Sequence, residues 1–276
     1  MANIPGTAGD DVLAGGAQND TITGADGNDV LAGLDGDDDL NGGPGNDVMV
    51  GGRGSDTVTG EAGNDVIVWN NGDGSDLMDG GADTDVQVVN GALADADDFR
   101  VDAGAGGAAV FQRVNLVPFA LTMDAVETLD VRGLGGDDRF IVGNLGGTDL
   151  QQVAFRGGAG NDWLDASATA TPLLAFGEDG NDILYGGTGD DFIDGGAGAD
   201  YVVYGAGGGR DTVVVDAADV VELRGLASAV LTSAVEVSFG ESSLLLDFGG
   251  GDALTLQWQP GAFAAADFYA SQVWAS

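Results

Sequence analysis

The stretch GADGNDVLAG, residues 24–33, is nearly copied by its neighbours in the chain. GTAGDDVLA, GGAQNDTIT and GGPGNDVMV keep the same spacing of glycine, aspartate and one apolar residue. Residues 6–68 divide into seven consecutive units of nine, and every unit begins with glycine. A Gly/Asp-rich disordered segment would not hold an apolar residue in phase through seven units. The fixed period therefore predicts a repeat architecture.

The sixth and eighth positions of the unit carry the pattern. The sixth residue is always Asp, the eighth is always apolar, and the fourth is glycine except at Gln18. Two extra residues, Trp69 and Asn70, precede two further units, and the last of these has Gln87 where an apolar residue belongs. The sixth-position aspartates of this first array are Asp11, Asp20, Asp29, Asp38, Asp47, Asp56, Asp65, Asp76 and Asp85.

A second array repeats this pattern after residue 156. It begins with GGAGNDWLD, continues after a degenerate stretch, and again contains two extra residues, Tyr204 and Gly205, before its last unit. Its sixth-position aspartates are Asp162, Asp182, Asp191, Asp200 and Asp211. Because both arrays close in the same way, an internal duplication is the simplest interpretation. The segment between them holds one isolated unit with Asp138, which is a further candidate ligand.

The composition restricts the chemistry of the chain. Its 276 residues carry a formal net charge of −38, with 40 Asp, 6 Glu and eight basic residues that are all arginine. Such a surface repels phosphates, so we expect no nucleic-acid partner. The absence of Cys and His excludes disulfides, thiol nucleophiles, imidazole bases and the usual zinc ligands. What remains is the chemistry of oxygen ligands.

Each unit splits into a six-residue turn and a three-residue strand. Glycine allows the positive φ angles and close backbone approach that the turn needs. Two units complete one coil of eighteen residues, and stacked coils form two parallel sheets around a thin apolar core. Stacking also places the aspartates in rows, one coil apart. Two carboxylates one coil apart repel each other by about 3 kcal/mol at an effective dielectric constant of about 20.

A hard dication bound between successive carboxylates would replace this repulsion by attraction and would hold neighbouring coils together. It would also take carbonyl oxygens that the turns point inward. Calcium suits such a site best, since it accepts six to eight oxygens in flexible geometry, whereas magnesium demands a tight octahedron. The repeats therefore predict a chain that binds several calcium ions.

The repeats resemble a known family. GGPGNDVMV and GGTGDDFID are similar to the repeats-in-toxin (RTX) nonapeptide, a calcium-binding repeat. The resemblance covers about half of the chain. It implies an all-β fold, a parallel β-roll or β-solenoid, with calcium-dependent folding and export by a type I secretion system that reads an uncleaved C-terminal signal.

The resemblance also implies the ligands. Sixth-position aspartates would bridge ions, and backbone carbonyls of positions one to four would complete each site. The paired aspartates would be Asp11/Asp29, Asp29/Asp47, Asp47/Asp65, Asp65/Asp85, Asp20/Asp38, Asp38/Asp56, Asp56/Asp76, Asp182/Asp200, Asp191/Asp211 and Asp162/Asp182. The fourth-position glycines that would supply carbonyls are Gly9, Gly27, Gly36, Gly45, Gly54, Gly63, Gly180, Gly189 and Gly198. About ten calcium ions would result.

Four regions follow from these patterns: a first array over 1–88, a β-solenoid spacer over 89–156, a second array over 157–214, and a β-rich C-terminal cap with a secretion region over 215–276. In the spacer, runs such as DDFRVDA and FALTM predict wider coils that continue the solenoid. The end of the chain, DFYASQVWAS, matches no specific export signal. No apolar run reaches the length of a membrane span, and the start of the chain lacks the pattern of a cleaved signal peptide.

The functional interpretation is a secreted, non-enzymatic calcium-binding structural protein at the cell surface or in the extracellular matrix, one that associates end to end. The alternative is a carrier or stabilising module for a separate exoprotein. A polysaccharide lyase would need Arg132, Arg139 or Arg156 as its base, and arginine is a poor proton acceptor. Ice binding would need a regular third position, which varies among Ala, Asp, Pro and Arg. Trp69 and Tyr204 could form an aromatic ligand pair, although bulky residues at insertions more often cover a coil edge.

Overall fold

The computed structural model describes residues 1–226, 238–239, 243–258 and 273–275. The chain is an all-β parallel β-solenoid, and it divides into two compact units. The first unit comprises Met1–Ala92, Asp97–Arg132 and Leu145–Val153. The second comprises Leu93–Ala96, Gly133–Asn144 and the described residues from Ala154 onward. In the described part of the chain, no helix is long and apolar enough to cross a membrane.

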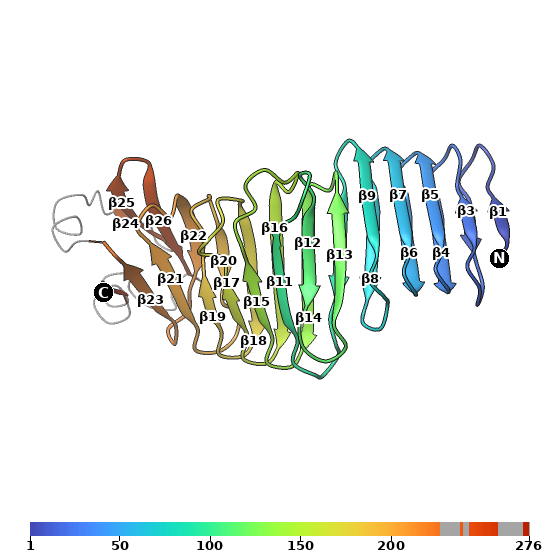
Figure 1. Ribbon diagram of the computed structural model, residues 1–276. Helices are drawn as coiled ribbons and strands as arrows, with labels where there is room; N and C mark the ends of the chain where they lie inside the picture. Colours follow the sequence, from blue (N-terminus) through green and yellow to red (C-terminus); the bar gives the residue numbers. More distant parts are fainter. Residues whose placement is uncertain (227–237, 240–242, 259–272, 276) are drawn as a thin grey trace. The chain divides into compact units, whose positions relative to one another are not determined.

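The first unit has two sheets, and through the repeat array their strands alternate along the chain. Successive strands of each sheet lie side by side in Figure 1. One sheet, sheet A, has the order β1 (Asn3–Pro5), β3 (Thr21–Thr23), β5 (Asp39–Pro44), β7 (Thr57–Ala62), β9 (Leu77–Ala82), β13 (Phe119–Asp124), β12 (Ala109–Arg113), β11 (Asp98–Ala103). The other, sheet B, has the order β2 (Val12–Ala14), β4 (Val30–Asp35), β6 (Val48–Arg53), β8 (Val66–Asn70), β10 (Val86–Asn90), β14 (Thr128–Gly135).

The strands of the repeats pair in parallel with a register of eighteen or twenty residues. Leu31 pairs with Met49, one coil of eighteen residues later, and Met49 with Ile67. Across the insertion of Trp69 and Asn70 the step is twenty residues, from Ile67 to Gln87. The structure thus confirms the coil of two nonapeptides, and it accommodates the insertion without loss of register.

The eighth residues of the units form the core, as the sequence predicts. Most of them lie buried because each short strand turns alternate side chains to opposite faces. The fully buried residues of this kind in the first array are Ile22, Leu31, Leu40, Met49, Val58 and Ile67. Gln87 is also fully buried at its eighth position, where its Nε2 donates a hydrogen bond to the Val88 carbonyl at 3.0 Å. A polar residue is therefore accepted in the last coil of the array.

The segment after the first array has a different topology. Strands β11 and β12 pair antiparallel, β12 and β13 pair antiparallel, and β13 pairs in parallel with β9. The first hairpin turns through Gly106 and Gly107, whose φ angles of +78° and +106° favour glycine. This antiparallel insert differs from the wider coils that the sequence predicts, because the chain reverses direction twice.

The second unit repeats the two-sheet arrangement. One sheet has the order β15 (Arg139–Val142), β17 (Trp163–Asp165), β19 (Ile183–Tyr185), β21 (Tyr201–Gly205), β23 (Val220–Arg224), β27 (Val273–Ala275). The other has the order β16 (Gln152–Ala159), β18 (Leu173–Asp179), β20 (Phe192–Asp194), β22 (Arg210–Val214), β26 (Asp252–Gln257), β25 (Ser243–Gly249), β24 (Ser238–Phe239). Strands β24 to β26 are antiparallel, and β26 pairs in parallel with β22. Most of the segment DFYASQVWAS lies outside the described residues.

Candidate metal centre

The sixth-position aspartates lie directly before the strands and are stacked in rows. In the first row, the Asp29 backbone N–H donates to Asp47 Oδ1 at 2.7 Å, and the Asp47 N–H donates to Asp65 Oδ1 at 2.8 Å. Each carboxylate therefore reaches across to the preceding coil. The same contact repeats at each step because the register of the coils is constant.

Four rows share this contact between neighbouring coils. The first row is Asp11, Asp29, Asp47, Asp65 and Asp85. The second row is Asp20, Asp38, Asp56 and Asp76. The third row is Asp138, Asp162, Asp182, Asp200 and Asp219. The fourth row is Asp191 and Asp211. All ten aspartate pairs expected from the sequence are neighbours in these rows.

The second carboxylate oxygen of many row aspartates has no hydrogen-bond partner. Asp47 is 1% exposed and Asp65 is fully buried, yet Oδ2 of each lacks a donor. Nine row aspartates share this feature: Asp29, Asp38, Asp47, Asp56, Asp65, Asp85, Asp162, Asp182 and Asp200. A buried carboxylate oxygen without a donor is costly unless a cation lies beside it.

Several aspartates outside this group satisfy Oδ2 within their own turn. The Gly16 N–H donates to Asp20 Oδ2 at 2.9 Å, and the Gly187 N–H donates to Asp191 Oδ2 at 2.7 Å. Asp11 receives the equivalent bond from the Thr7 N–H at 2.6 Å. In the turns with a bare Oδ2 the second residue has a positive φ angle, as at Ala25 (+82°) and Gly43 (+103°), whereas the donors Thr7, Gly16 and Gly187 do not.

First-position glycines leave the space that these oxygens occupy. A Cβ at Gly24 would lie 2.2 Å from Asp29 Oδ2 and 2.5 Å from the Gly42 carbonyl oxygen. At Gly177 the corresponding distances are 2.1 Å to Asp182 Oδ2 and 2.4 Å to the Gly195 carbonyl oxygen. A side chain there would collide with both oxygens. The glycine thus lets a carboxylate and a carbonyl from neighbouring coils approach the same point.

Fourth-position glycines stack their turns equally closely. Gly45 has a φ angle of +153°, and a Cβ on it would lie 1.6 Å from the Gly27 carbonyl oxygen. Gly63 stands in the same relation to the Gly45 carbonyl, at 1.7 Å. The carbonyls of the fourth-position glycines, which the sequence predicts as ligands, therefore lie against the turn of the next coil.

Burial raises the pKa of many row aspartates. Desolvation is the largest cause for Asp56, whose pKa rises to about 6, and for Asp76, whose pKa rises to about 7. It also raises the pKa of Asp211 to about 8. Asp20, at the start of the second row, differs because the Ala2 N–H holds its pKa below the usual value. Inside a row, the charged form of an aspartate is thus destabilised when no cation is bound.

The donor set fits calcium. In the described residues, no three acidic side chains converge on one point. Neighbouring coils offer two carboxylates and several turn carbonyls, which are hard oxygen ligands of the kind calcium prefers. In each row the carboxylates of successive aspartates would hold the ions, and the cation would supply the charge that the bare Oδ2 atoms lack. The role of each named residue as a ligand stays a prediction.

Three acidic residues extend the rows, and the sequence analysis missed two of them, Glu127 and Asp219. Glu127 accepts the Asp85 N–H at 2.8 Å, Asp138 begins the third row, and Asp219 accepts the Asp200 N–H at 3.0 Å. Glu127 and Asp219 lie outside the glycine-rich units. Each lies two residues before a buried apolar residue, Leu129 or Val221. That spacing, without the glycines, would have found both.

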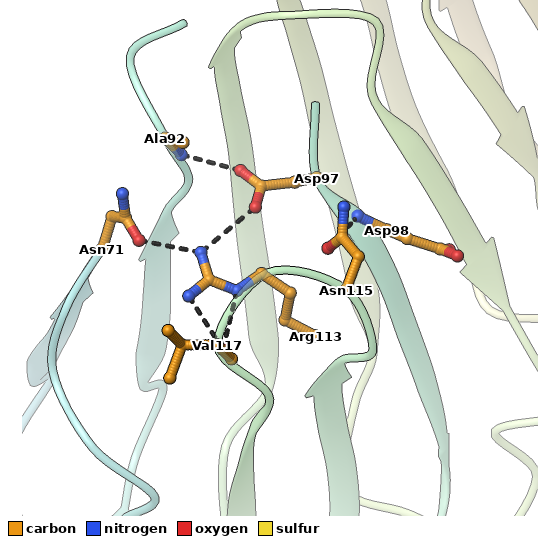
Figure 2. A network of polar contacts seen from close by, with 7 residues as sticks. All are labelled: Asn71, Ala92, Asp97, Asp98, Arg113, Asn115 and Val117. Carbon is orange, nitrogen blue, oxygen red and sulfur yellow. Dashed lines mark hydrogen bonds and ion pairs between the residues drawn. The ribbon is translucent and has the colours of Figure 1, made fainter. Parts of the chain in front are cut away.

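A further turn carboxylate, Asp97, has a cation from the chain itself. It accepts the Ala92 N–H at 2.7 Å and lies 3.1 Å from Nη1 of Arg113 (Figure 2). The Arg113 side chain is 3% exposed, and the Asp97 side chain is fully buried. Arginine thus neutralises this buried carboxylate.

The aromatic residues at the insertions are buried. Trp69 is fully buried, stacks on Phe119 with ring centroids 3.7 Å apart, and donates from Nε1 to the Gly74 carbonyl. Tyr204 is 2% exposed, and its hydroxyl donates to the Gly209 carbonyl. Both residues cover coil edges, which favours the packing role over an aromatic ligand pair.

One comparison with known proteins, that with protein families, agrees with the repeat geometry. The family RTX calcium-binding nonapeptide repeat (4 copies) matches residues 5–40, 41–68, 155–169 and 176–213. Among the curated proteins, none matches this chain. The extracellular lipase LipA from Serratia marcescens aligns at 19% identity and a TM-score of 0.27, over 98% of this chain and 39% of the lipase. The matched residues in both arrays thus carry the RTX calcium-binding nonapeptide repeat that the sequence suggests.

Proposed function

We propose that this chain is a secreted structural protein that folds when calcium fills its rows of aspartates. The observation that carries the proposal is the set of nine row aspartates whose buried Oδ2 atoms have no hydrogen-bond donor. Calcium bound between coils would repay the desolvation of these carboxylates and offset part of the net charge of −38. Binding free energy would then become folding free energy.

Secretion fits this chemistry. Extracellular calcium modules bind in the range of about 10⁻⁴ to 10⁻³ M, so the chain would stay unfolded inside the cell and fold outside it. The resemblance to RTX proteins supports export by a type I system. A location at the cell surface or in the extracellular matrix completes the proposal.

End-to-end self-association would explain a structural role without catalysis. In the described chain, β1 pairs only with β3 and β2 only with β4, so each offers a free edge. Free strand edges recruit other chains. A contact between unlike ends of a solenoid would be heterologous and would generate filaments. Calcium at the junction would make the contact switchable.

The alternative is a carrier or stabilising module for a separate exoprotein. It shares the calcium-dependent fold but needs no self-association. Electron microscopy of the purified protein with and without millimolar calcium separates the two roles. Ordered fibres or sheets in calcium favour the structural role, whereas persistent monomers favour the carrier role.

The calcium-dependent fold itself is tested by far-ultraviolet circular dichroism. We expect an unfolded spectrum in chelator and a cooperative gain of β-structure near 10⁻⁴ to 10⁻³ M calcium, roughly the range of extracellular modules. Magnesium at the same concentration should give a smaller change, since it dehydrates reluctantly. A fully folded spectrum in chelator would refute the proposal.

A further inference from the structure

The turns that end at the sixth-position aspartates have two backbone conformations. In the first, which we name the open turn, the second residue of the unit has a positive φ angle and the aspartate Oδ2 has no donor, as at Leu34 and Asp38. In the second, the closed turn, the second residue donates its backbone N–H to Oδ2, as Gly16 does to Asp20. Among the described turns, 6–11, 15–20 and 186–191 are closed. Nine turns are open, and they end at Asp29, Asp38, Asp47, Asp56, Asp65, Asp85, Asp162, Asp182 and Asp200.

Two distances also separate the closed turns from the open turns. A Cβ built on the first-position glycine would lie 2.9 to 3.0 Å from Oδ2 in the closed turns and 2.0 to 2.6 Å from it in the open turns. The fourth-position carbonyl differs in the same way. A Cβ built on the fourth-position glycine of the following coil would lie 2.5 to 3.0 Å from this carbonyl oxygen over a closed turn, and 1.3 to 1.8 Å from it over an open turn. The two conformations therefore differ in both kinds of oxygen that calcium would use.

The open turn is unfavourable for the protein alone. Its second residue is Ala25, Leu34, Glu61 or Glu178 in four of the units, with φ angles of +82°, +82°, +78° and +74°. Side chains other than glycine rarely adopt this region, and such strain persists only where the surroundings impose it. In these same turns the aspartate Oδ2 is buried without a donor, and Asp29 is only 1% exposed. A bound cation would offset both costs, whereas a closed turn avoids both.

The preceding coil explains which turns are closed. The aspartate of every open turn accepts, at Oδ1, the backbone N–H of an aspartate one coil earlier. Asp20 accepts the Ala2 N–H instead, and Asp191 accepts the Leu173 N–H, so neither is stacked on a repeat turn. In the described chain, Asp11 lies in the same first coil as Asp20. A calcium ion between coils takes oxygens from both, so a turn without a repeat turn on the preceding coil lacks part of the ligand set.

We propose that the closed turn is a calcium-free form of the repeat turn, in which a backbone N–H takes the place of the ion at Oδ2. The second residue of the unit then determines whether a turn binds calcium, because only the open conformation leaves Oδ2 without the N–H. The inference rests on the calcium binding of the proposed function, and it assigns the ions to the open turns. Asp11, Asp20 and Asp191 then hold no ion through Oδ2.

This assignment divides the ten aspartate pairs into two classes. Three pairs contain an aspartate of a closed turn, and these are Asp11/Asp29, Asp20/Asp38 and Asp191/Asp211. The closed turns satisfy their carboxylates with the protein's own N–H groups, so loss of calcium leaves these carboxylates hydrogen-bonded. The other pairs depend on the ion.

Matched alanine variants test which turns hold ions. Asp191→Ala removes the carboxylate of a closed turn, and Asp182→Ala removes that of an open turn in the same array. Native mass spectrometry in saturating calcium counts the ions bound per chain, and circular dichroism checks the fold. We expect Asp182→Ala to lose at least one ion relative to the unchanged protein, and Asp191→Ala to lose none.

The outcomes separate this inference from the proposed function. Loss of an ion from Asp191→Ala would overturn the inference and would leave calcium in the rows. If neither variant loses an ion, the row carboxylates do not hold calcium, and the ligand role on which both proposals rest is refuted.

Substitutions at the second position test the inference without removing a carboxylate. Leu34 is half exposed, so Leu34→Gly and Leu34→Val differ mainly in how readily they adopt a φ angle of +82°. We expect the calcium midpoint of folding, measured by circular dichroism, to be at least about fivefold higher for Leu34→Val than for Leu34→Gly.

Gly16→Val is the matched control in a closed turn. The φ angle of Gly16 is not positive, and a Cβ there would lie 3.7 Å from Asp20 Oδ2, an ordinary contact. We expect Gly16→Val to leave the calcium midpoint no higher than that of the unchanged protein. Equal effects of valine in place of glycine at positions 34 and 16 would overturn the inference, whereas a folded spectrum in chelator would refute only the proposed calcium dependence.

Discussion

The repeat arrays and the antiparallel insert of the first unit bury carboxylates in different ways. In the arrays, aspartates such as Asp47 and Asp65 are stacked one coil apart, and their Oδ2 atoms have no donor from the protein. In the insert, buried Asp97 lies 3.1 Å from the Arg113 guanidinium. The aspartate rows of the arrays therefore depend on cations from solution, whereas the insert supplies Arg113 as the cation for its buried aspartate.

Arg113 also joins the insert to the array. Its Nη1 donates to Asn71 Oδ1 at 2.7 Å, and its Nε and Nη2 donate to the Val117 carbonyl (Figure 2). The guanidinium lies 5.2 Å from the Phe119 ring centroid, within reach of a cation–π contact. Asn71 occupies the first position of its unit, where most units have glycine. The Arg113 guanidinium thus connects the insert to Asn71 at this end of the array.

Calcium removal should separate the two regions most strongly. We expect the amides of β4, β6 and β8 to lose their protection from hydrogen exchange in chelator, because the carboxylates of the rows repel without cations. The amides of β11 and β12 should lose protection at lower free calcium, since their buried charges are already paired. Hydrogen exchange with mass spectrometry across a calcium titration measures both. Loss of protection in the insert before the array would contradict the comparison.

Removal of the Arg113 guanidinium should have the next largest effect, on the free energy of unfolding. Arg113→Ala leaves Asp97 buried without a partner, and breaking a buried pair costs about 3 to 5 kcal/mol. Calcium should not restore this loss, because the site was built for a guanidinium. The measurement is the free energy of unfolding by urea in saturating calcium.

Arg100 provides a matched control for Arg113. It pairs with Asp102 in the same hairpin, but the two side chains are 46% and 39% exposed. Exposed pairs contribute about 0 to 1 kcal/mol, so Arg100→Ala should change the free energy of unfolding little. If the two variants are equally stable, the Arg113 pair does not hold the insert.

The coil geometry was predictable because it depends on local chemistry that repeats. Glycine at fixed positions, Asp at the sixth and an apolar residue at the eighth determine the turn, the strand and the buried side, and the structure confirms the parallel β-roll. The antiparallel insert was not predictable in the same way. Its strands have the same β-branched and aromatic composition as coil strands, and only the tertiary pairing of β12 with β11 and β13 reverses the chain.

The rows were predictable only where the glycines mark them. Glu127 and Asp219 occupy the same place before a strand, but their turns lack the repeat pattern. The pairing of Asp97 with Arg113 joins residues from separate strands and turns, so neither residue marks it in the sequence. Periodicity therefore identifies the sites that repeat, and single contacts need the structure.

The position of an aspartate within its row should determine how strongly its replacement raises the calcium midpoint of folding. Asp47 has neighbours in the coils on both sides, whereas Asp11 lies at the start of the first row and is more exposed. Asp47→Asn keeps a side-chain acceptor and removes a charge that would face two ions. We expect it to raise the calcium midpoint about three- to tenfold, and Asp11→Asn about twofold or less. Circular dichroism during calcium titration measures both, and equal shifts would mean that the rows are not continuous.

The smallest expected effect is that of pH on the calcium-free chain. The folded coil raises the pKa of Asp56 to about 6 and that of Asp76 to about 7, mainly by desolvation. The unfolded chain has the ordinary value near 4. As pH falls from 7.5 toward 5, the folded state therefore takes up protons that the unfolded state does not, and its stability rises.

Calcium should reverse this dependence, because protons compete with the ion for the same carboxylates. In chelator we expect slightly more β-structure at pH 5.5 than at pH 7.5, whereas in calcium the midpoint should move to higher calcium at pH 5.5. Asp76→Asn removes a group whose pKa is strongly raised and should weaken the gain in chelator. Salt screens the general repulsion of a chain with net charge −38, so the comparison is made at fixed high ionic strength. If the β-structure in chelator decreases as the pH is lowered, the row aspartates behave as carboxylates stabilised by ion pairs. Burial of charged carboxylates is then not what makes the arrays depend on calcium.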